Sequence, residues 1–261
     1  MDRPAEPARP APPADAIPLS RRVPFARQIA DTLRDLIVRG DLAAGSRIVE
    51  RTLCERLSVS RTPLREALKL LEADGLIELS QNRGARVMSM TITEAGHLFE
   101  LIAGLEGFAA ELAVARACPD DIIALELQHA QMLKHYADQE KDAYFALNNA
   151  IHDAVVRLSG NPLLIATHAS ILLRARRGRY MAIVDPLRWR ESVAEHAALM
   201  AAFRSCDAPA AGAVWRQHLR RTGETVRTAL GQPAVSADGA SEQHSAETCL
   251  TGSETRRPSS D

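Results

Sequence analysis

Arginine side chains with the chemistry to read DNA gather in one segment of the chain. Arg61, Thr62 and Arg65 stand at the start of a stretch whose leucines recur with helical spacing. Arginine matches guanine edges and phosphate oxygens, and the free amide groups at a helix start attract anions. A solvated basic face is the plainer alternative. The candidate DNA contacts are Arg51, Arg61, Thr62, Arg65, Arg83 and Gly84.

A second group of side chains has the chemistry of metal ligands. Asn148 and His152 are four residues apart, so on one helix they face the same point. His196 and His218 follow on what we expect to be two further helices. Spacing alone leaves open whether the four converge, because a lone histidine on a helix is more often an ordinary core or surface residue.

The elements that position the arginines are short helices. Apolar residues from Phe25 to Ile37 form one helical stripe that Gly40 closes. Residues 42–48 are expected to be a loop, and Leu53 and Leu57 mark a second short helix. A third helix is expected with Thr62 as its cap and Gly75 at its end.

A hairpin pattern follows these helices. Two apolar runs, 76–79 and 85–88, flank a turn whose asparagine and glycine favour positive φ. Three helices and a β-hairpin predict a winged helix-turn-helix over residues 21–90. This region leans basic, although the whole chain carries a net charge of -1.

The rest of the folded chain shows helical periodicity only. We expect an all-α bundle of about six helices over residues 91–231, which makes the fold mainly α. Asp120 is expected to cap the second of these helices. The expected helices cover 92–117, 120–136, 141–158, 163–181, 187–205 and 209–230.

Composition excludes several classes of protein. No stretch approaches the roughly 18 apolar residues that cross a bilayer. Residues 1–20 are rich in proline and alanine without the apolar core of a signal peptide, so we expect a disordered arm and a cytoplasmic protein. Residues 232–261 are expected to be a disordered tail. The four cysteines form no Cys-x-x-Cys pair, which excludes a zinc-finger framework.

The first region resembles a known family. The segments 51–68, 70–77 and 82–87 are similar to the winged-helix domain of GntR-family bacterial transcription regulators. The resemblance implies that Arg51, Arg61, Thr62, Arg65 and Gly84 contact operator DNA. It also implies a homodimer in which each subunit reads one half of a short palindrome.

The second region resembles the FCD ligand-binding domain of the FadR-type branch of that family. The similar segments are 147–162, Glu195-His196 and Trp215 to His218. In metal-binding members, one Asp or Asn and three His hold a divalent cation. Because Asn148, His152, His196 and His218 fill those positions, the resemblance implies a metal site. Three imidazoles suit Zn or Ni.

One departure from the family concerns the effector. Ile102 stands where members usually carry an arginine associated with ligand carboxylates. Either carboxylate recognition moves to an arginine among 174, 176, 177 and 179, or the effector has a larger apolar part that contacts Ile102. We therefore place Ile102, Arg174 and Arg176 in the expected effector pocket.

The resemblance implies a repressor controlled by a small metabolite, an organic acid bound near the metal. A regulator that senses the metal itself is the first alternative. A metallohydrolase is the second, disfavoured because no His-Glu-x-x-His motif or second carboxylate at general-base spacing is present. We expect no enzymatic activity and no membrane partner.

Overall fold

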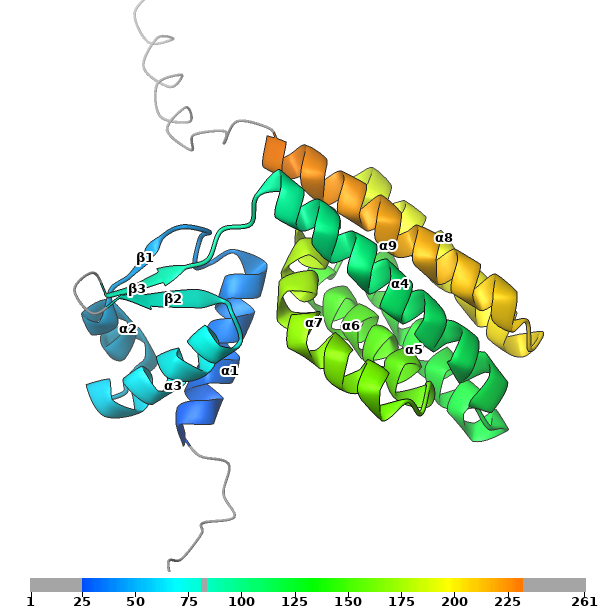
Figure 1. The fold of residues 1–261 in the computed structure, drawn as a ribbon, viewed down its shortest axis with the longest axis horizontal. Coiled ribbons are helices and arrows are strands. Elements are labelled where there is room, and N and C mark those ends of the chain that lie inside the picture. Colours follow the sequence, from blue (N-terminus) through cyan, green and yellow to red (C-terminus); the bar gives the residue numbers. More distant parts are fainter. Residues whose placement is uncertain (1–24, 81–83, 232–261) are drawn as a thin grey trace, which may run out of the picture.

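The computed structural model describes residues 25–80 and 84–231, so the predicted arm, the predicted tail and Arg83 lie outside the described residues. The described chain forms two domains (Figure 1). The first contains α1 (Phe25–Arg39), β1 (Arg47–Ile48), α2 (Glu50–Leu57), α3 (Arg61–Ala73), β2 (Ile77–Ser80) and β3 (Gly84–Val87).

The first domain is the expected winged helix-turn-helix, with two local differences. Residues 42–48 are not all loop, because Arg47 and Ile48 form β1, which pairs with β3 in a sheet of order β1-β3-β2. Two residues are too few to show a strand alternation. The N-cap of α3 is Ser60, whose backbone is extended, and Thr62 lies inside the first turn.

The second domain is the expected bundle of helices (Figure 1). The α4 and α9 helices pack along each other, and α7 lies on the side of the bundle that meets α1. The bundle consists of α4 (Ile92–Arg116), α5 (Pro119–Ala137), α6 (Lys141–Leu158), α7 (Pro162–Ala182), α8 (Pro186–Arg204) and α9 (Ala208–Gly231).

The start of α5 differs from the sequence prediction. Cys118, not Asp120, is the N-cap. Asp121 accepts a hydrogen bond from the Cys118 backbone N–H at 2.9 Å, so the carboxylate one residue further along satisfies the free amide group.

Two glycines let helices approach closely inside the bundle. A Cβ atom added to Gly178 of α7 would lie 2.6 Å from Phe99 Cε2, and one added to Gly223 of α9 would lie 2.5 Å from Phe99 Cβ. The ring of Phe99, on α4, therefore occupies the space that larger residues would need.

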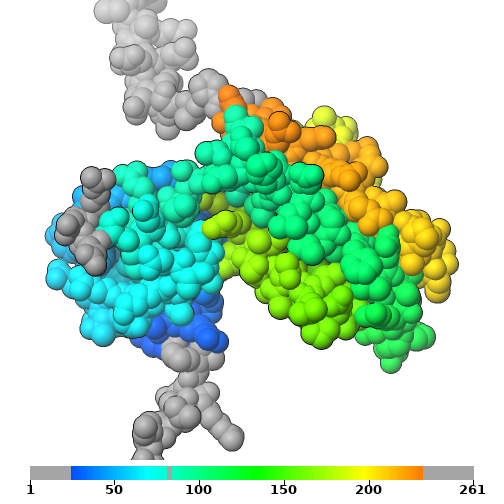
Figure 2. All heavy atoms as spheres, viewed as in Figure 1, coloured from blue at the N-terminus to red at the C-terminus, as the bar shows by residue number. Residues whose placement is uncertain are grey.

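The two domains meet at α7. Leu173 of α7 packs against the apolar core of the first domain, and Val38 of α1 belongs to the core of the bundle. Figure 2 shows the two lobes in contact, with a notch opening beneath the junction. No helix of the described chain has the length and hydropathy required to span a membrane.

Candidate metal centre and DNA-binding surface

The α3 helix has a buried apolar face and an exposed basic one. Leu64 and Leu68 are buried in the core of the first domain, whereas Arg61 and Arg65 are exposed. Arg65 Nε lies 3.0 Å from Glu50 Oε2, so this arginine is already held by α2. Arg61 makes no ion pair within the described residues and is free to contact DNA.

The remaining predicted contacts surround this helix. Thr62 is exposed beside Arg61. Arg51 is exposed on α2, with its Nη1 atom 3.9 Å from Glu55 Oε1. Gly84 opens β3 with a φ of +74°, a value that glycine adopts without strain. The structure thus presents these residues on the surface of one domain.

Sequence analysis missed a further cation beside the wing. Arg47 of β1 lies opposite Arg86 of β3, and its guanidinium would be 3.9 Å from a Cβ atom on Gly84. Arg86 is committed to the Gly45 carbonyl oxygen, to which its Nη1 donates at 2.6 Å. The signal was hidden because Arg47 was assigned to a loop.

The three predicted histidine ligands converge in the bundle. His152 comes from α6, His196 from α8 and His218 from α9, and one ligand nitrogen of each lies within 4.8 Å of the others. All three rings are buried. A divalent cation at their meeting point would have three imidazole donors from three different helices.

Unsatisfied polar atoms mark the same point. His152 Nε2, His218 Nε2 and both ring nitrogens of His196 are buried without a hydrogen-bond partner in the described chain. Asn148 Oδ1, one turn before His152, is also buried and unpartnered. Because such atoms are costly to leave unpaired, the donor set fits a bound metal ion.

Two carboxylates fix the orientation of the ligand rings. His218 Nδ1 lies 2.7 Å from Glu195 Oε2, and His152 Nδ1 is hydrogen-bonded to Glu106 Oε2. When each Nδ1–H donates to its carboxylate, each Nε2 keeps a lone pair for the metal. Glu106 and Glu195 were not predicted as parts of the site.

Glu106 is fully buried and accepts several hydrogen bonds. Besides His152, its donors are His168 Nε2 at 2.9 Å, Trp215 Nε1 at 3.1 Å and Arg179 Nη1 at 3.3 Å. Burial alone would raise the pKa of Glu106, but the charge of Arg179 and the hydrogen bonds from His152 and His168 hold it well below its usual value. Glu106 is therefore ionised at neutral pH.

The ligand histidines are neutral in the folded protein. Burial lowers the pKa of His152 to about 3 and holds the pKa of His196 well below its usual value. Burial also lowers the pKa of His218, although the bond to Glu195 opposes it. Neutral imidazole is the form that binds metal ions, so no proton needs to be displaced near pH 7.

The indole of Trp215 packs against all three ligand rings. Its ring centroid lies 4.5 Å from that of His152, 4.7 Å from His196 and 4.8 Å from His218. This aromatic wall and its bond to Glu106 limit how far the ligand rings can turn.

A small cavity with two buried guanidinium groups lies beside the ligands. Its volume is about 10 Å³, room for about one water molecule. Asn148 and His218 line it together with Arg179 and Arg188. Arg179 Nε and Nη2 and Arg188 Nε and Nη1 have no hydrogen-bond partner among the described residues. Buried cations with spare donors favour an anionic ligand.

The structure does not bring the predicted effector residues together at this cavity. Ile102 is fully buried in an apolar cluster that includes Ala182, which itself lines the cavity. Arg176 Nη2 is paired with Asp153 Oδ2 at 2.5 Å, and Arg174 lines a different pocket, between the domains. Arg188, which sequence analysis did not consider, takes a place at the cavity.

Two protein-family models match the chain. The model described as bacterial regulatory proteins, gntR family, matches residues 25–87, and the model described as the FCD domain matches residues 97–221. A solved structure titled E. coli McbR/YncC superposes with a TM-score of 0.70 at 20% identity, covering 80% of this chain and 99% of that one. This likeness shows the shared fold.

Curated relatives carry regulator names. An uncharacterized HTH-type transcriptional regulator of Streptomyces ambofaciens is 29% identical over 74% of this chain and 81% of its own length. The Glc operon transcriptional activator of Escherichia coli K12 is 30% identical over 55% of this chain and 64% of its own length. The transcriptional repressor GlaR of the same organism is 27% identical over 72% of this chain and 89% of its own length.

Proposed function

Because the chain belongs to the GntR family of bacterial transcription regulators and carries an FCD domain, we propose that it is a repressor controlled by an organic acid bound beside a divalent metal ion. The family consists of transcription regulators and not of enzymes, which removes the metallohydrolase alternative. DNA binding follows from the family. The metal, the effector and the sign of regulation are the proposal.

Operator recognition is assigned to the exposed face of α3 and to the wing. Arg61, Thr62 and Arg65 read base edges or phosphates, and Arg51 and Gly84 also contact the operator DNA, as the resemblance implies. The protein works as a homodimer on a short palindrome, in the cytoplasm. Support for a second copy comes from α4, where the large apolar side chains of Leu101 and Phe108 are exposed two turns apart on one face.

The metal is assigned to Asn148, His152, His196 and His218, with Zn or Ni as the ion. The observation that carries this assignment is the convergence of three buried histidines whose Nε2 atoms, like Asn148 Oδ1 one turn away, lack hydrogen-bond partners in the described chain. A bound ion would supply a Lewis acid to which an oxygen of the effector coordinates. Asn148 gives a neutral amide oxygen, a weaker ligand than a carboxylate.

The effector is assigned to the cavity beside these ligands. Arg179 and Arg188 offer spare donors to a carboxylate there, which compensates for Ile102 in place of the family's arginine. Ile102 does not line the cavity, but it belongs to the same apolar cluster as Ala182, which does, so a change of size at Ile102 would reach the ligand only through that cluster. Because the cavity holds only about one water, the arginines must move when an acid binds.

A repressor role is supported by the repressor GlaR, which aligns over 72% of the chain, whereas the Glc operon activator aligns over 55%. An operator can be selected from random DNA by its binding to the protein. Transcription from a promoter that carries this operator, with and without the protein, then shows whether the protein represses or activates. A rise in transcription with added protein would contradict repression.

Metal analysis tests the proposed metal site, and operator binding tests the proposed effector. Protein purified without a histidine tag and reloaded with Zn²⁺ or Ni²⁺ should hold one ion per chain, and His196→Ala should not. An organic acid should then shift operator affinity in the loaded protein, and Arg188→Gln should weaken that shift. If chelation alone abolishes or restores operator binding, with no acid required, the protein is a metal sensor instead.

A further inference from the structure

The α7 helix presents opposite faces to the two domains. Successive helix residues are rotated by about 100°, so His168 and Arg179 share one side, while Leu173 and Arg177 lie on the other. His168 and Arg179 donate hydrogen bonds to Glu106, the residue that holds the ligand His152. Leu173 packs against the core of the winged domain. The α7 helix therefore lies between the metal centre and the winged domain and contacts the surroundings of both.

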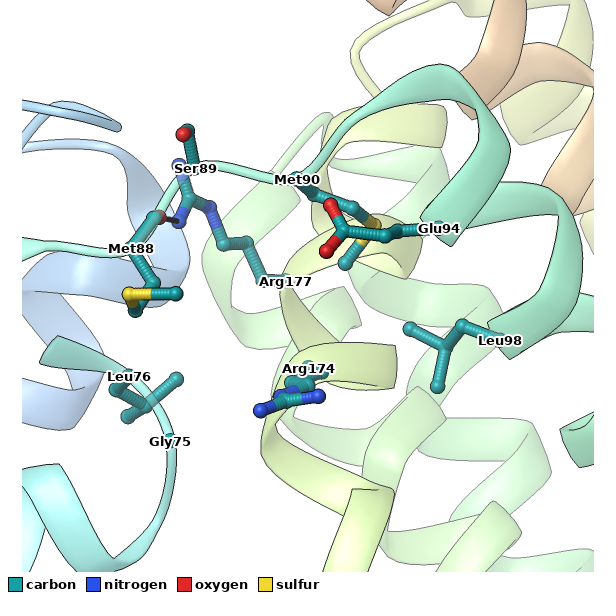
Figure 3. A pocket seen from close by; sticks show the side chains of 9 residues that line it. All are labelled: Gly75, Leu76, Met88, Ser89, Met90, Glu94, Leu98, Arg174 and Arg177. Atoms are coloured by element: carbon teal, nitrogen blue, oxygen red, sulfur yellow. Dashed lines mark hydrogen bonds between the residues drawn. The ribbon is translucent and has the colours of Figure 1, made fainter.

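The contacts of α7 fall on the ends of two DNA-reading elements. Arg177 Nη1 donates to the Met88 carbonyl oxygen at 2.7 Å, directly after wing strand β3 (Figure 3). Arg174 lies against the turn that ends α3, where a Cβ atom on Gly75 would be 2.6 Å from Arg174 Nη2. A displacement of α7 would reach both the recognition helix and the wing.

The interface around these contacts is incompletely filled. A pocket of about 100 Å³ separates the two domains, with Arg174 and Arg177 on the α7 side (Figure 3). Leu76 and Met88 line it from the winged domain, and Leu98 lines it from α4. Since an unfilled interface resists relative motion less than a packed one, the winged domain can pivot where α7 touches it.

We propose that α7 couples occupancy of the metal centre to the position of the winged domain, an inference that rests on the proposed metal site. Filling the site fixes His152, which fixes Glu106 and, through it, His168 and Arg179 on α7. The helix then carries the constraint to Met88 and Gly75 through Arg177 and Arg174. Shifts of packed helices by 1–2 Å are a common means of such transmission.

A rival route runs along α4, which contains Glu106 and begins directly after the connection between the domains. The two routes respond differently to substitution. Arg177→Ala removes the bond to Met88 and leaves α4 unchanged, and Leu173→Ala weakens the apolar contact of α7 by an independent change. Arg190→Ala is the matched control, because Arg190 is exposed on α8 and makes no ion pair in the described part of the chain.

The test is amide hydrogen exchange of the full chain with and without Ni²⁺. In the wild type and in Arg190→Ala, Ni²⁺ should slow exchange in α7 and also in α3 and β3. In Arg177→Ala and Leu173→Ala, Ni²⁺ affinity should be retained and slowing in α7 should persist. The slowing in α3 and β3 should be lost.

Two results would overturn the inference while leaving the metal site intact. Ni²⁺ could bind the wild type without changing exchange in α3 and β3, or both variants could keep the full wild-type response, which would assign the coupling to α4. Failure of the wild type to bind Ni²⁺ would instead contradict the proposed metal site, and the inference with it.

Discussion

Glu195 Oε2 lies 2.7 Å from His218 Nδ1, and this bond determines which nitrogen of the ring faces the metal centre. The same oxygen accepts a hydrogen bond from Arg188 Nη2 at 2.7 Å. Arg188 also donates to the His218 carbonyl oxygen and to Thr222 Oγ1. One carboxylate thus joins a metal ligand to an arginine of the adjacent cavity.

Replacing this carboxylate should weaken metal binding without removing a ligand. Loss of a residue that orients a ligand typically costs about 10- to 100-fold in metal affinity, so Glu195→Gln should show a loss in that range. Competition with a chelator of known affinity measures it. The control is Glu224→Gln, because Glu224 is an exposed residue of α9. Equal losses in both variants would contradict the assigned role of Glu195.

The recognition helix makes a direct prediction. Arg61→Ala and Arg65→Ala should each cost about 1–3 kcal/mol in binding to the specific operator, because each removes a base or phosphate contact. Fluorescence anisotropy at fixed salt measures the loss, with Arg190→Ala as the control. The assignment of α3 as the recognition helix is wrong if neither arginine variant binds more weakly.

Arg47 should contribute in a different way. Its place beside the wing suits a phosphate, which carries no sequence information. Arg47→Ala should weaken binding to specific and unrelated DNA alike and reduce the slope of log affinity against log salt by about one. An effect confined to the specific operator would show that Arg47 reads bases.

Close helix packing predicts opposite effects for two glycines. Gly178→Ala should destabilise the protein by about 1–3 kcal/mol, because the methyl group meets the Phe99 ring and overpacking outweighs the gain in helix propensity. A Cβ atom added to Gly96 would lie no closer than 3.8 Å to its nearest neighbour, Arg227 Cδ, so Gly96→Ala should stabilise by about 0.5–1 kcal/mol. Urea unfolding of both variants measures the difference, and a stabilised Gly178→Ala would contradict the packing.

Tyr144 predicts a loss of stability at high pH. Burial raises the pKa of its phenol to about 12, from an ordinary value of 10.0. The folded protein therefore holds this proton more tightly than the unfolded chain, and the stabilisation is present below pH 10 and lost as the pH rises toward 12. The difference in unfolding free energy between wild type and Tyr144→Phe should fall by about 1 kcal/mol between pH 9 and pH 11. A constant difference would exclude this titration.

The helices could be predicted from the sequence because their signals are local. For α6, the spacing of apolar residues and the break that follows gave the observed bounds, Lys141–Leu158. The same helix places Asn148 and His152 one turn apart, as their spacing requires. β1 gave no signal, since its two residues are a strand only because β3 lies beside them.

The sequence spacing of the site residues could not show that they come together in the fold. Glu106 is 46 residues from His152 in the sequence, and only the packing of α4 against α6 brings them together. The resemblance to a family supplied His196 and His218 but not the residues that orient them. Arg188 and Glu195 are seven residues apart on α8, so a search for charge pairs at two-turn spacing could have found them.

Because the indole of Trp215 packs against the three ligand rings, it is an intrinsic fluorescent probe of the metal centre. The chain contains only two tryptophans, and the other, Trp189, packs against Tyr136 and Tyr144. With Trp189 replaced by phenylalanine, the emission of a single indole would report on the three imidazoles beside it. A paramagnetic ion such as Ni²⁺ would quench that emission, so occupancy could be followed in seconds, without a label and in the same cuvette as operator DNA.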